Sequence, residues 1–274
     1  MTARMNGAGE VVWITGASSG IGAALARAYA RRDKRLILSG RNETALADVA
    51  AQCGVEHLLL PFDIGEFHLA SAAADVAWEW SGGIDVLVNN AGISHRSLAV
   101  ETEFAVYQRI IDIDLLGPIA LTQALIKRMA ARRAGQIVMI SSLAGKVGSP
   151  RRSAYCAAKH GLIGYADALR IELSIHNVSV IGVTPGTVRT DIWRNAISVG
   201  EQKASSGKAY DPGIDPDDFA RRMLAAIDAG EREVSIADRE LDLMIAQARR
   251  TPDALFDTMI AAFKSEADSA QAPL

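Results

Sequence analysis

VVWITGASSGIG, at residues 11–22, is the most informative stretch of this 274-residue chain. It begins with an apolar run typical of a buried strand, continues with three glycines within seven positions, and leads into apolar residues at helical spacing. We predict a strand, a tight turn and a helix, in that order. Such a turn aims backbone N–H groups and the positive end of a helix dipole at an anion such as a pyrophosphate.

The three glycines of this turn have separate physical reasons. Gly16 permits the tight turn, Gly20 lets the backbone approach a phosphate, and Gly22 allows the helix and the strand to pack closely. Glycines at this density also occur in ordinary turns that bind nothing. Their position directly after the first predicted strand favours a nucleotide site.

The rest of the chain alternates between short β-type apolar runs and longer stretches of helical periodicity. This alternation predicts an α/β fold, a single doubly wound Rossmann-type domain with a seven-stranded parallel sheet and helices on both faces. The predicted strands are residues 11–15, 35–39, 57–62, 85–89, 136–141, 178–184 and 233–236. The predicted helices are residues 20–32, 43–52, 66–80, 101–133, 153–176, 215–229, 240–250 and 252–264. We expect Gly117-Pro118 to bend or divide the long fourth helix.

No linker, composition change or repeat divides the chain, so we predict one domain over residues 1–274. Residues 186–216 lack periodicity, and a long irregular segment inside a compact domain is typical of a substrate lid. Its apolar side chains suit a partly apolar pocket; they include Trp193, Ile197, Val199 and Tyr210. We expect residues 265–274 to form a frayed tail.

The composition argues against several functional classes. Charged residues make up 22% of the chain and the formal net charge is -3, which gives no field suited to a nucleic acid or an anionic membrane. No signal peptide is recognised, and no apolar run is long enough to span a bilayer. Cys53 and Cys156 lack metal-ligand spacing and suit a reducing compartment. We expect a cytoplasmic protein without a nucleic-acid, membrane or metal partner.

The end of the second predicted strand indicates which dinucleotide binds. About twenty residues past the glycine turn, a carboxylate would be expected to bind the ribose 2′-hydroxyl of NAD, but the sequence there is Ser39-Gly40-Arg41. Arg41 offers a planar set of donors that suits a 2′-phosphate, which favours NADP(H) over NAD(H). The alternative is a solvated surface arginine. Asp33 and Glu43 lie nearby but are poorly placed to bind the ribose.

Tyr155 and Lys159 lie four residues apart on a predicted helix, so both project from one face. A phenol with a pKa near 10 exchanges protons poorly at neutral pH, but an ammonium one turn away favours the phenolate. Tyr155 would then act as an acid or base toward a carbonyl or alcohol oxygen. Ser142, at the end of the fifth predicted strand, would stabilise the charge that develops on that oxygen. Each residue alone also has an ordinary structural interpretation.

The chain resembles the short-chain dehydrogenase/reductase family from residue 11 to about residue 236. The matching motifs are Thr-Gly-x-x-x-Gly-x-Gly at 15–22, Asp63, Asn-Asn-Ala-Gly at 89–92, Ser142, Tyr155-x-x-x-Lys159 and Pro-Gly-Thr-Val-Arg-Thr at 185–190. Residues 135–191 most resemble the dehydrogenase/reductase branch, whose animal members are often membrane-associated. The leading apolar anchor of those proteins is not recognised here.

The resemblance implies a cofactor site along the whole edge of the sheet. Ser18, Ser19 and Ile21 would line the phosphates, and Arg41 would take the 2′-phosphate. Asp63 and the backbone of Ile64 would meet the adenine. The remaining contacts would go to the two riboses and the nicotinamide, from Asn90, Ala91, Gly92, Tyr155, Lys159, Pro185, Gly186, Val188 and Thr190. The resemblance also implies a homodimer or homotetramer.

One position departs from the family pattern. The fourth catalytic residue of the family is usually an asparagine, and Asp114 stands there if Gly117 is the glycine that follows it three residues later. The main-chain carbonyl, which holds a relay water in the family, is unaffected by this change. The carboxylate would oppose Lys159 by favouring the protonated phenol. We therefore expect an alkaline displacement of the pH optimum for alcohol oxidation.

The favoured function is an NADP(H)-dependent oxidoreductase that interconverts a carbonyl and a primary or secondary alcohol. The small-molecule substrate is expected to be hydrophobic, but neither its identity nor the direction follows from the sequence. One alternative is a non-catalytic NADP-binding redox sensor, which the Asp114 departure keeps open. The other is a sugar-nucleotide epimerase or dehydratase, which the glycine spacing disfavours.

Overall fold

The structure is a computed structural model that describes residues 9–198 and 213–237, together with residues 240, 244, 257–261 and 265. Its strands are β1 (Val11–Thr15), β2 (Arg35–Ser39), β3 (His57–Leu59), β4 (Val86–Asn89), β5 (Gly135–Ile140), β6 (Val178–Pro185) and β7 (Glu233–Ile236). They form one sheet in the order β3-β2-β1-β4-β5-β6-β7, and every neighbouring pair is parallel. The direction of winding reverses between β1 and β4, where open α/β sheets bind ligands.

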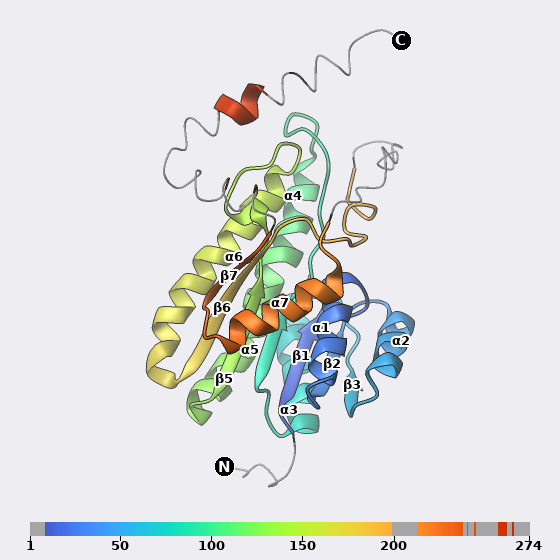
Figure 1. Cartoon of the computed structure of the whole chain (residues 1–274), viewed down its shortest axis with the longest axis vertical. Coiled ribbons are helices and arrows are strands. Elements are labelled where there is room, and N and C mark those ends of the chain that lie inside the picture. Colours follow the sequence, from blue (N-terminus) through green and yellow to red (C-terminus); the bar gives the residue numbers. More distant parts are fainter. Residues whose placement is uncertain are drawn as a thin grey trace.

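Helices cover both faces of the sheet (Figure 1). One face packs against α1 (Gly20–Ala30), α2 (Glu43–Cys53) and α7 (Pro216–Asp228). The other packs against α3 (Ala70–Ser81), α5 (Gly117–Arg132) and α6 (Ser153–Glu172). A further helix, α4 (Phe104–Ile111), contacts α6. The predicted doubly wound Rossmann-type fold is confirmed.

The strand side chains explain why both faces are covered. In β1, Val12 and Ile14 point into one apolar cluster while Val11 and Trp13 point into the other, and all four are fully buried. A strand that is apolar on both faces is stable only between two layers of helices. Trp13 also satisfies its indole N–H by donating to Ser39 Oγ at 2.8 Å.

The predicted element boundaries differ from the observed ones by a few residues, most clearly at β3. That strand ends at Leu59 rather than at residue 62. Hydrogen bonding to the neighbouring segment nevertheless continues, since the N–H groups of Leu60 and Phe62 donate to Leu38 and Gly40. The chain is therefore still extended where it reaches the ligand-binding edge at Asp63.

The predicted helix over residues 101–133 is divided near Gly117-Pro118 into α4 and α5, in line with the sequence-based expectation. Between α4 and α5 the chain passes through a π-helical turn, Asp112–Leu116. Pro118 lies in the first turn of α5, where its missing N–H costs least. Gly117 is required by a close approach, because a Cβ there would lie 2.5 Å from the Ile64 carbonyl oxygen.

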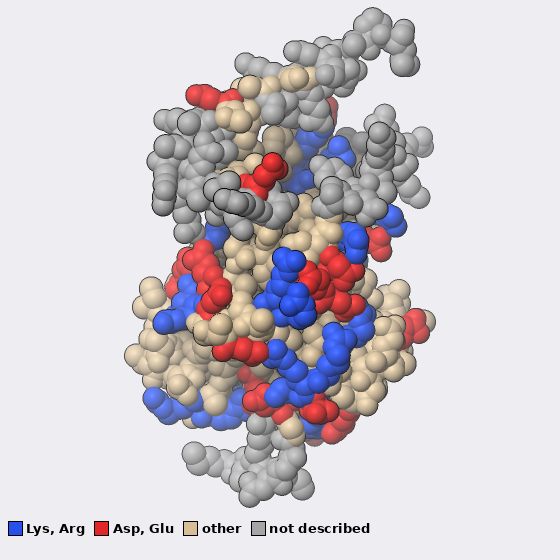
Figure 2. All heavy atoms as spheres, viewed as in Figure 1, with Lys and Arg blue, Asp and Glu red and all other residues tan. Residues whose placement is uncertain are grey.

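Ion pairs connect α1 to α7 across the surface seen in Figure 2, where cationic and anionic side chains are interspersed. Arg27 pairs with Asp217 at 3.0 Å, and Arg32 pairs with Asp228 at 2.7 Å. These partners are partly exposed, so each pair contributes at most about 1 kcal/mol. They add to the apolar packing of α7 on α1, in which Phe219 and Met223 of α7 are fully buried.

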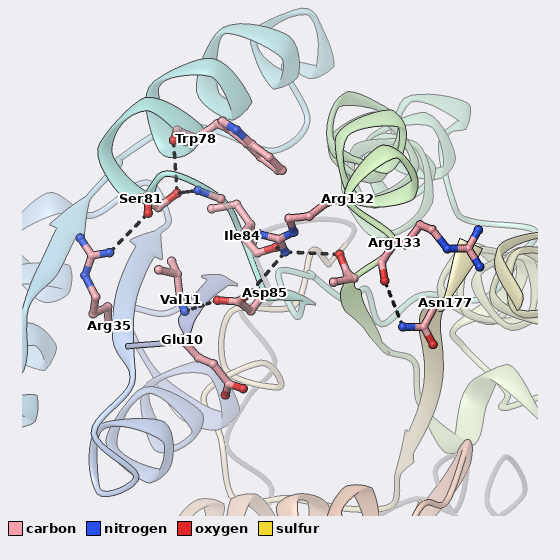
Figure 3. Close-up of polar contacts among 12 residues, drawn as sticks. Glu10, Val11, Arg35, Trp78, Ser81, Ile84, Asp85, Arg132, Arg133 and Asn177 are labelled. Atoms are coloured by element: carbon pink, nitrogen blue, oxygen red, sulfur yellow. Dashed lines mark hydrogen bonds and ion pairs between the residues drawn. The ribbon is translucent and has the colours of Figure 1, made fainter. Parts of the chain in front are cut away.

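A polar network joins the amino ends of the strands, at the edge opposite the glycine turn (Figure 3). Asp85 accepts the Val11 N–H at 2.7 Å and lies 3.4 Å from Arg132. Arg132 also donates to the Ile84 carbonyl at 2.5 Å. The network therefore links the starts of β1 and β4 to the end of α5.

Some predictions fall partly or wholly outside the described residues. Of the predicted lid, residues 186–198 and 213–216 are described, and Val199 and Tyr210 are not. Of the two predicted terminal helices, residues 240, 244 and 257–261 are described, and all are helical. The predicted tail lies outside the described residues apart from Ser265. No helix in the described part of the chain combines the length and apolar character needed to cross a bilayer.

Candidate active site

A cleft of about 530 Å³ lies at the carboxyl ends of the strands, a size typical of sites for small molecules and cofactors. Its walls come from the segments that follow β1 to β6. All the residues that the sequence assigned to the site line this cleft, with the exception of Gly22: Gly16, Ser18, Ser19, Gly20, Ile21, Arg41, Asp63, Ile64, Asn90, Ala91, Gly92, Ser142, Tyr155, Lys159, Pro185, Gly186, Val188 and Thr190.

Gly22 lies behind the turn and acts through packing. A Cβ on Gly22 would lie 2.1 Å from the Gly16 carbonyl oxygen, so no side chain fits there. Gly16 and Gly20 have φ values of 65° and 53°, in the left-handed region where glycine carries no steric penalty. These values agree with the tight turn predicted at Gly16 and the close packing predicted at Gly22, and the role of Gly20 toward a phosphate stays a prediction.

The turn is fixed to the segment after β4 by hydrogen bonds. Thr15 Oγ1 accepts the N–H groups of Asn90 and Ala91 at 3.0 and 3.1 Å. The Asn90 amide in turn donates to the carbonyl of Thr15 at 2.9 Å. The two loops on either side of the switch point therefore form one rigid wall.

The amino end of α1 has the features that an anion site needs. The side chain of its N-cap residue, Ser19, makes no capping hydrogen bond, and the first turn carries no acidic residue. Backbone N–H groups there remain available to a ligand, and the helix dipole favours negative charge. The described residues at this end of the cleft thus fit the phosphates of a dinucleotide.

Ser142, Tyr155 and Lys159 come together at the other end of the cleft. Ser142 follows β5 and caps the short helix after it, accepting the Ala144 N–H at 3.2 Å. Its hydroxyl also hydrogen-bonds the Tyr155 hydroxyl. The Lys159 ammonium lies 5.6 Å from the centre of the Tyr155 ring. The predicted proximity of the three side chains is confirmed.

Lys159 is held in place from two further directions. Its ammonium donates to the Ile140 carbonyl at 3.2 Å and lies 3.3 Å from Asp114 Oδ2. Asp114 is fully buried, and its Oδ1 accepts the Ile93 N–H at 2.8 Å. Burial acts to lower the pKa of Lys159, but the charges of Asp114 and Tyr155 outweigh it and raise that pKa. The lysine is therefore a permanent cation at neutral pH.

The pKa of Tyr155 reflects opposing influences. Burial raises it most, the charge of Lys159 lowers it, and the charge of Asp114 raises it again. The Ser142 hydrogen bond and the charge of Arg152 also lower it, but the net shift in the protein alone is upward. The expected opposition between Asp114 and Lys159 thus has the predicted direction. The direct ion pair between them was not foreseen.

The substrate end of the cleft has an apolar wall with a few polar groups. Ile192 and Trp193 line it, as does Ser94, whose buried hydroxyl has no hydrogen-bond partner among the described residues. Arg152 stacks over the Trp193 ring at 3.6 Å. Ile197 forms a parallel bridge with His95, so the start of the predicted lid is anchored beside the site.

Sequence reasoning missed several residues around the cleft. Arg109 donates to Asp63 at 2.7 Å from a helix 46 positions later in the chain. Ser94 and Arg152 were not assigned either. The sequence singled out Asp114 by its position three residues before Gly117, but its direct ion pair with Lys159 was not predicted. Nothing in the sequence singles out Arg109, because its contact depends on how α4 docks.

The parallel doubly wound sheet, the glycine turn and the Ser142, Tyr155 and Lys159 cluster define a nucleotide-binding oxidoreductase of Rossmann type. Comparison with known proteins agrees. The family model described as short chain dehydrogenase matches residues 10–199. The chain belongs to the short-chain dehydrogenase/reductase family.

Relatives and solved structures resemble the chain over most of its length. Dehydrogenase/reductase SDR family member 7B of Xenopus tropicalis is 34% identical over 267 residues, covering 93% of this chain and 86% of the relative. A short-chain dehydrogenase structure from Streptomyces avermitilis has a TM-score of 0.79 at 27% identity, covering 94% of this chain and 98% of that one. A short-chain dehydrogenase from Sphingobium yanoikuyae, solved in complex with NADPH, has a TM-score of 0.75 at 26% identity, covering 96% and 98%.

Proposed function

We propose that the protein is an NADP(H)-dependent oxidoreductase that interconverts a carbonyl with a primary or secondary alcohol, with Tyr155 as the acid/base. The observation that carries this proposal is the buried lysine ammonium beside a buried phenol that hydrogen-bonds Ser142. A permanent cation beside a phenol favours the phenolate and so lets that phenol exchange a proton.

The cofactor proposal rests on the two ends of the cleft. The uncapped amino end of α1 would bind the pyrophosphate, and Arg41 would bind the 2′-phosphate. Tyr155 and Lys159 would hold the nicotinamide ribose, and Val188 and Thr190 would contact the nicotinamide. NADPH in the structure from Sphingobium yanoikuyae, and NADP in a metagenomic short-chain oxidoreductase of 31% identity, support the choice of NADP(H). When bound, the nicotinamide supplies or accepts the hydride.

The side chains of the protein would handle the proton and the developing charge. In reduction, Tyr155 would donate its hydroxyl proton to the substrate oxygen, and the Lys159 charge would stabilise the phenolate that results. Ser142 would donate a hydrogen bond to the same substrate oxygen. In alcohol oxidation the phenolate would accept the proton instead.

The apolar wall of Ile192 and Trp193 favours a hydrophobic ketone, aldehyde or alcohol as substrate. The test is a panel of such compounds with NADPH and with NADH. We expect turnover of several hydrophobic carbonyl compounds with NADPH, and lower kcat/KM with NADH. Preference for NADH would overturn the cofactor proposal. Tight NADPH binding without turnover across the panel would favour a non-catalytic redox sensor.

A further inference from the structure

Asp63 lies between two arginines at the adenine end of the cleft. It follows β3, and its Oδ1 accepts the Gly65 N–H at 2.9 Å. Its Oδ2 accepts a hydrogen bond from Arg109 Nη2 at 2.7 Å, whereas Arg41 Nη1 lies 4.0 Å from the same oxygen. Arg109 therefore hydrogen-bonds the carboxylate directly, whereas Arg41 lies at the longest distance that still counts as an ion pair.

The two arginines face different surroundings. Arg41 lines the cleft, and its side chain is 65% exposed. Arg109 comes from α4, is 41% exposed, and is absent from the cleft lining. The side chain of Arg41 is thus placed to meet a ligand, whereas that of Arg109 is placed to meet Asp63.

Asp63 keeps its negative charge at neutral pH. Burial acts to raise its pKa, but the hydrogen bonds from Gly65 and Arg109 and the charges of Arg109 and Arg41 outweigh burial and lower it. An ionised carboxylate at this position opposes a 2′-phosphate in two ways. It repels the phosphate, and it competes for the Arg41 guanidinium. A second cation bound to the carboxylate reduces both effects.

We infer that Arg109 is a positioning residue for cofactor selectivity, which neutralises and holds Asp63 so that Arg41 stays available to the 2′-phosphate of NADP(H). This inference rests on the proposed preference for NADP(H). It assigns the selectivity to three side chains, Arg41, Asp63 and Arg109, rather than to the single arginine after β2. Arg109 acts through Asp63 and does not need to touch the cofactor.

The test measures ligand binding without turnover. Calorimetric titration with adenosine 2′,5′-bisphosphate and with 5′-AMP, at one ionic strength, gives the selectivity for the 2′-phosphate as the ratio of two affinities. Arg109→Gln is expected to lower this ratio about tenfold, while 5′-AMP affinity changes less than about threefold. In an Asp63→Asn background, the same Arg109→Gln change is expected to alter the ratio less than about twofold, because no carboxylate needs neutralising.

Two results would overturn the inferred role of Arg109 and leave the proposed preference for NADP(H) standing. An equal loss of both affinities in Arg109→Gln would mean that the arginine supports the adenine wall. An equal drop of the ratio with and without the Asp63 carboxylate would mean that Arg109 acts on the phosphate directly. Arg128→Gln is the matched control, since Arg128 is similarly exposed at 36% and pairs with Asp75 on α3. It should leave both affinities unchanged.

The wild-type protein separates this inference from the proposed function. A wild-type ratio near one would refute the NADP(H) preference itself, and the inference would fall with it. The other informative result is a high affinity ratio in the wild type that is lost in Arg41→Gln but kept in Arg109→Gln. That result would support the proposed preference for NADP(H) and refute only the inferred role of Arg109.

Discussion

Asp114 places a carboxylate in a site where the chemistry depends on the charge of a lysine. Its charge raises the pKa of Tyr155, whereas Lys159 lowers it. Removing the carboxylate should therefore lower the pKa of the phenol and make phenolate available at lower pH. Two other groups that lower the pKa of Tyr155, namely Ser142 and Arg152, are not altered when the Asp114 carboxylate is removed.

For Asp114→Asn, we predict that the acidic limb of the pH profile of kcat/KM for alcohol oxidation moves to lower pH. The asparagine amide keeps an oxygen that can accept the Ile93 N–H, so the local fold should persist. A profile recorded with saturating NADP+ checks this. An unmoved profile would show that the carboxylate has no electrostatic effect on the phenol, and a shift to higher pH would show that it acts mainly by keeping Lys159 charged.

The buried ion pair also makes a prediction about stability. Lys159→Met leaves the fully buried Asp114 without its cation, so we expect a loss of about 3–5 kcal/mol in the free energy of unfolding. Adding Asp114→Asn removes the unpaired charge and should recover most of that loss without recovering activity. Urea denaturation of the two variants measures both effects. Equal stability of the single and double variants would mean that the pair is not coupled.

Residue types and spacing predicted the glycine turn, Arg41, Ser142, Tyr155 and Lys159, and the family resemblance supplied the rest of the candidate site along the edge of the sheet. The glycine spacing, Arg41 and the Tyr155/Lys159 pair each carry a local physical reason, and the cleft brings these residues together. Arg109 and Ser94 escaped prediction because their contacts join segments that only the tertiary fold places side by side. Their functional roles, like those of the predicted residues, remain predictions.

At the scale of elements, the sequence predicted that the long helix would be bent or divided near Gly117-Pro118, but not that a π-helical turn, Asp112–Leu116, would divide it. The proline lies in the first turn of the next helix, where it is tolerated. The turn also contains Asp114, whose carboxylate reaches Lys159. π-helical turns of this kind are frequently found at functional sites.

Gly117 tests whether this turn positions the adenine loop. Gly117→Ala puts a methyl group 2.5 Å from the Ile64 carbonyl oxygen, so we predict a loss of about 1–3 kcal/mol in stability and weaker binding of NADP+. Urea denaturation and calorimetric titration measure the two effects. Gly164→Ala on α6 is the control, because nothing lies within 4 Å of its added Cβ. If the two variants behaved alike, the close approach would be unimportant.

At the scale of the whole molecule, the parallel sheet and both apolar layers could be predicted from the sequence, whereas the order of the strands was not predicted. Uninterrupted apolar strands require cover on both faces, and alternation with helices requires parallel pairing. The sequence contained less information about the network at the amino ends of the strands, because Asp85 and Arg132 look like ordinary surface charges until the sheet brings them together. This network lies at the edge opposite the cleft and should affect stability alone.

Asp85→Ala should therefore lower the free energy of unfolding by about 1–3 kcal/mol, since the Val11 N–H loses its acceptor. Asp85→Asn keeps an acceptor and should cost less. NADP+ affinity should match the wild type in both variants when measured well below their unfolding transitions. A change in affinity without a change in stability would contradict the separation of the two edges.

The central claim concerns proton transfer by one phenol, and Tyr155→Phe tests it most directly. The substitution removes a single oxygen from a buried ring, so the fold should change little, and the affinity for NADPH should fall by at most about tenfold, the loss of one hydrogen bond to the ribose. We predict that the single-turnover rate of hydride transfer to the best substrate of the panel falls about 10²–10⁴-fold. A rate equal to that of the wild type, with NADPH bound normally, would contradict the mechanism.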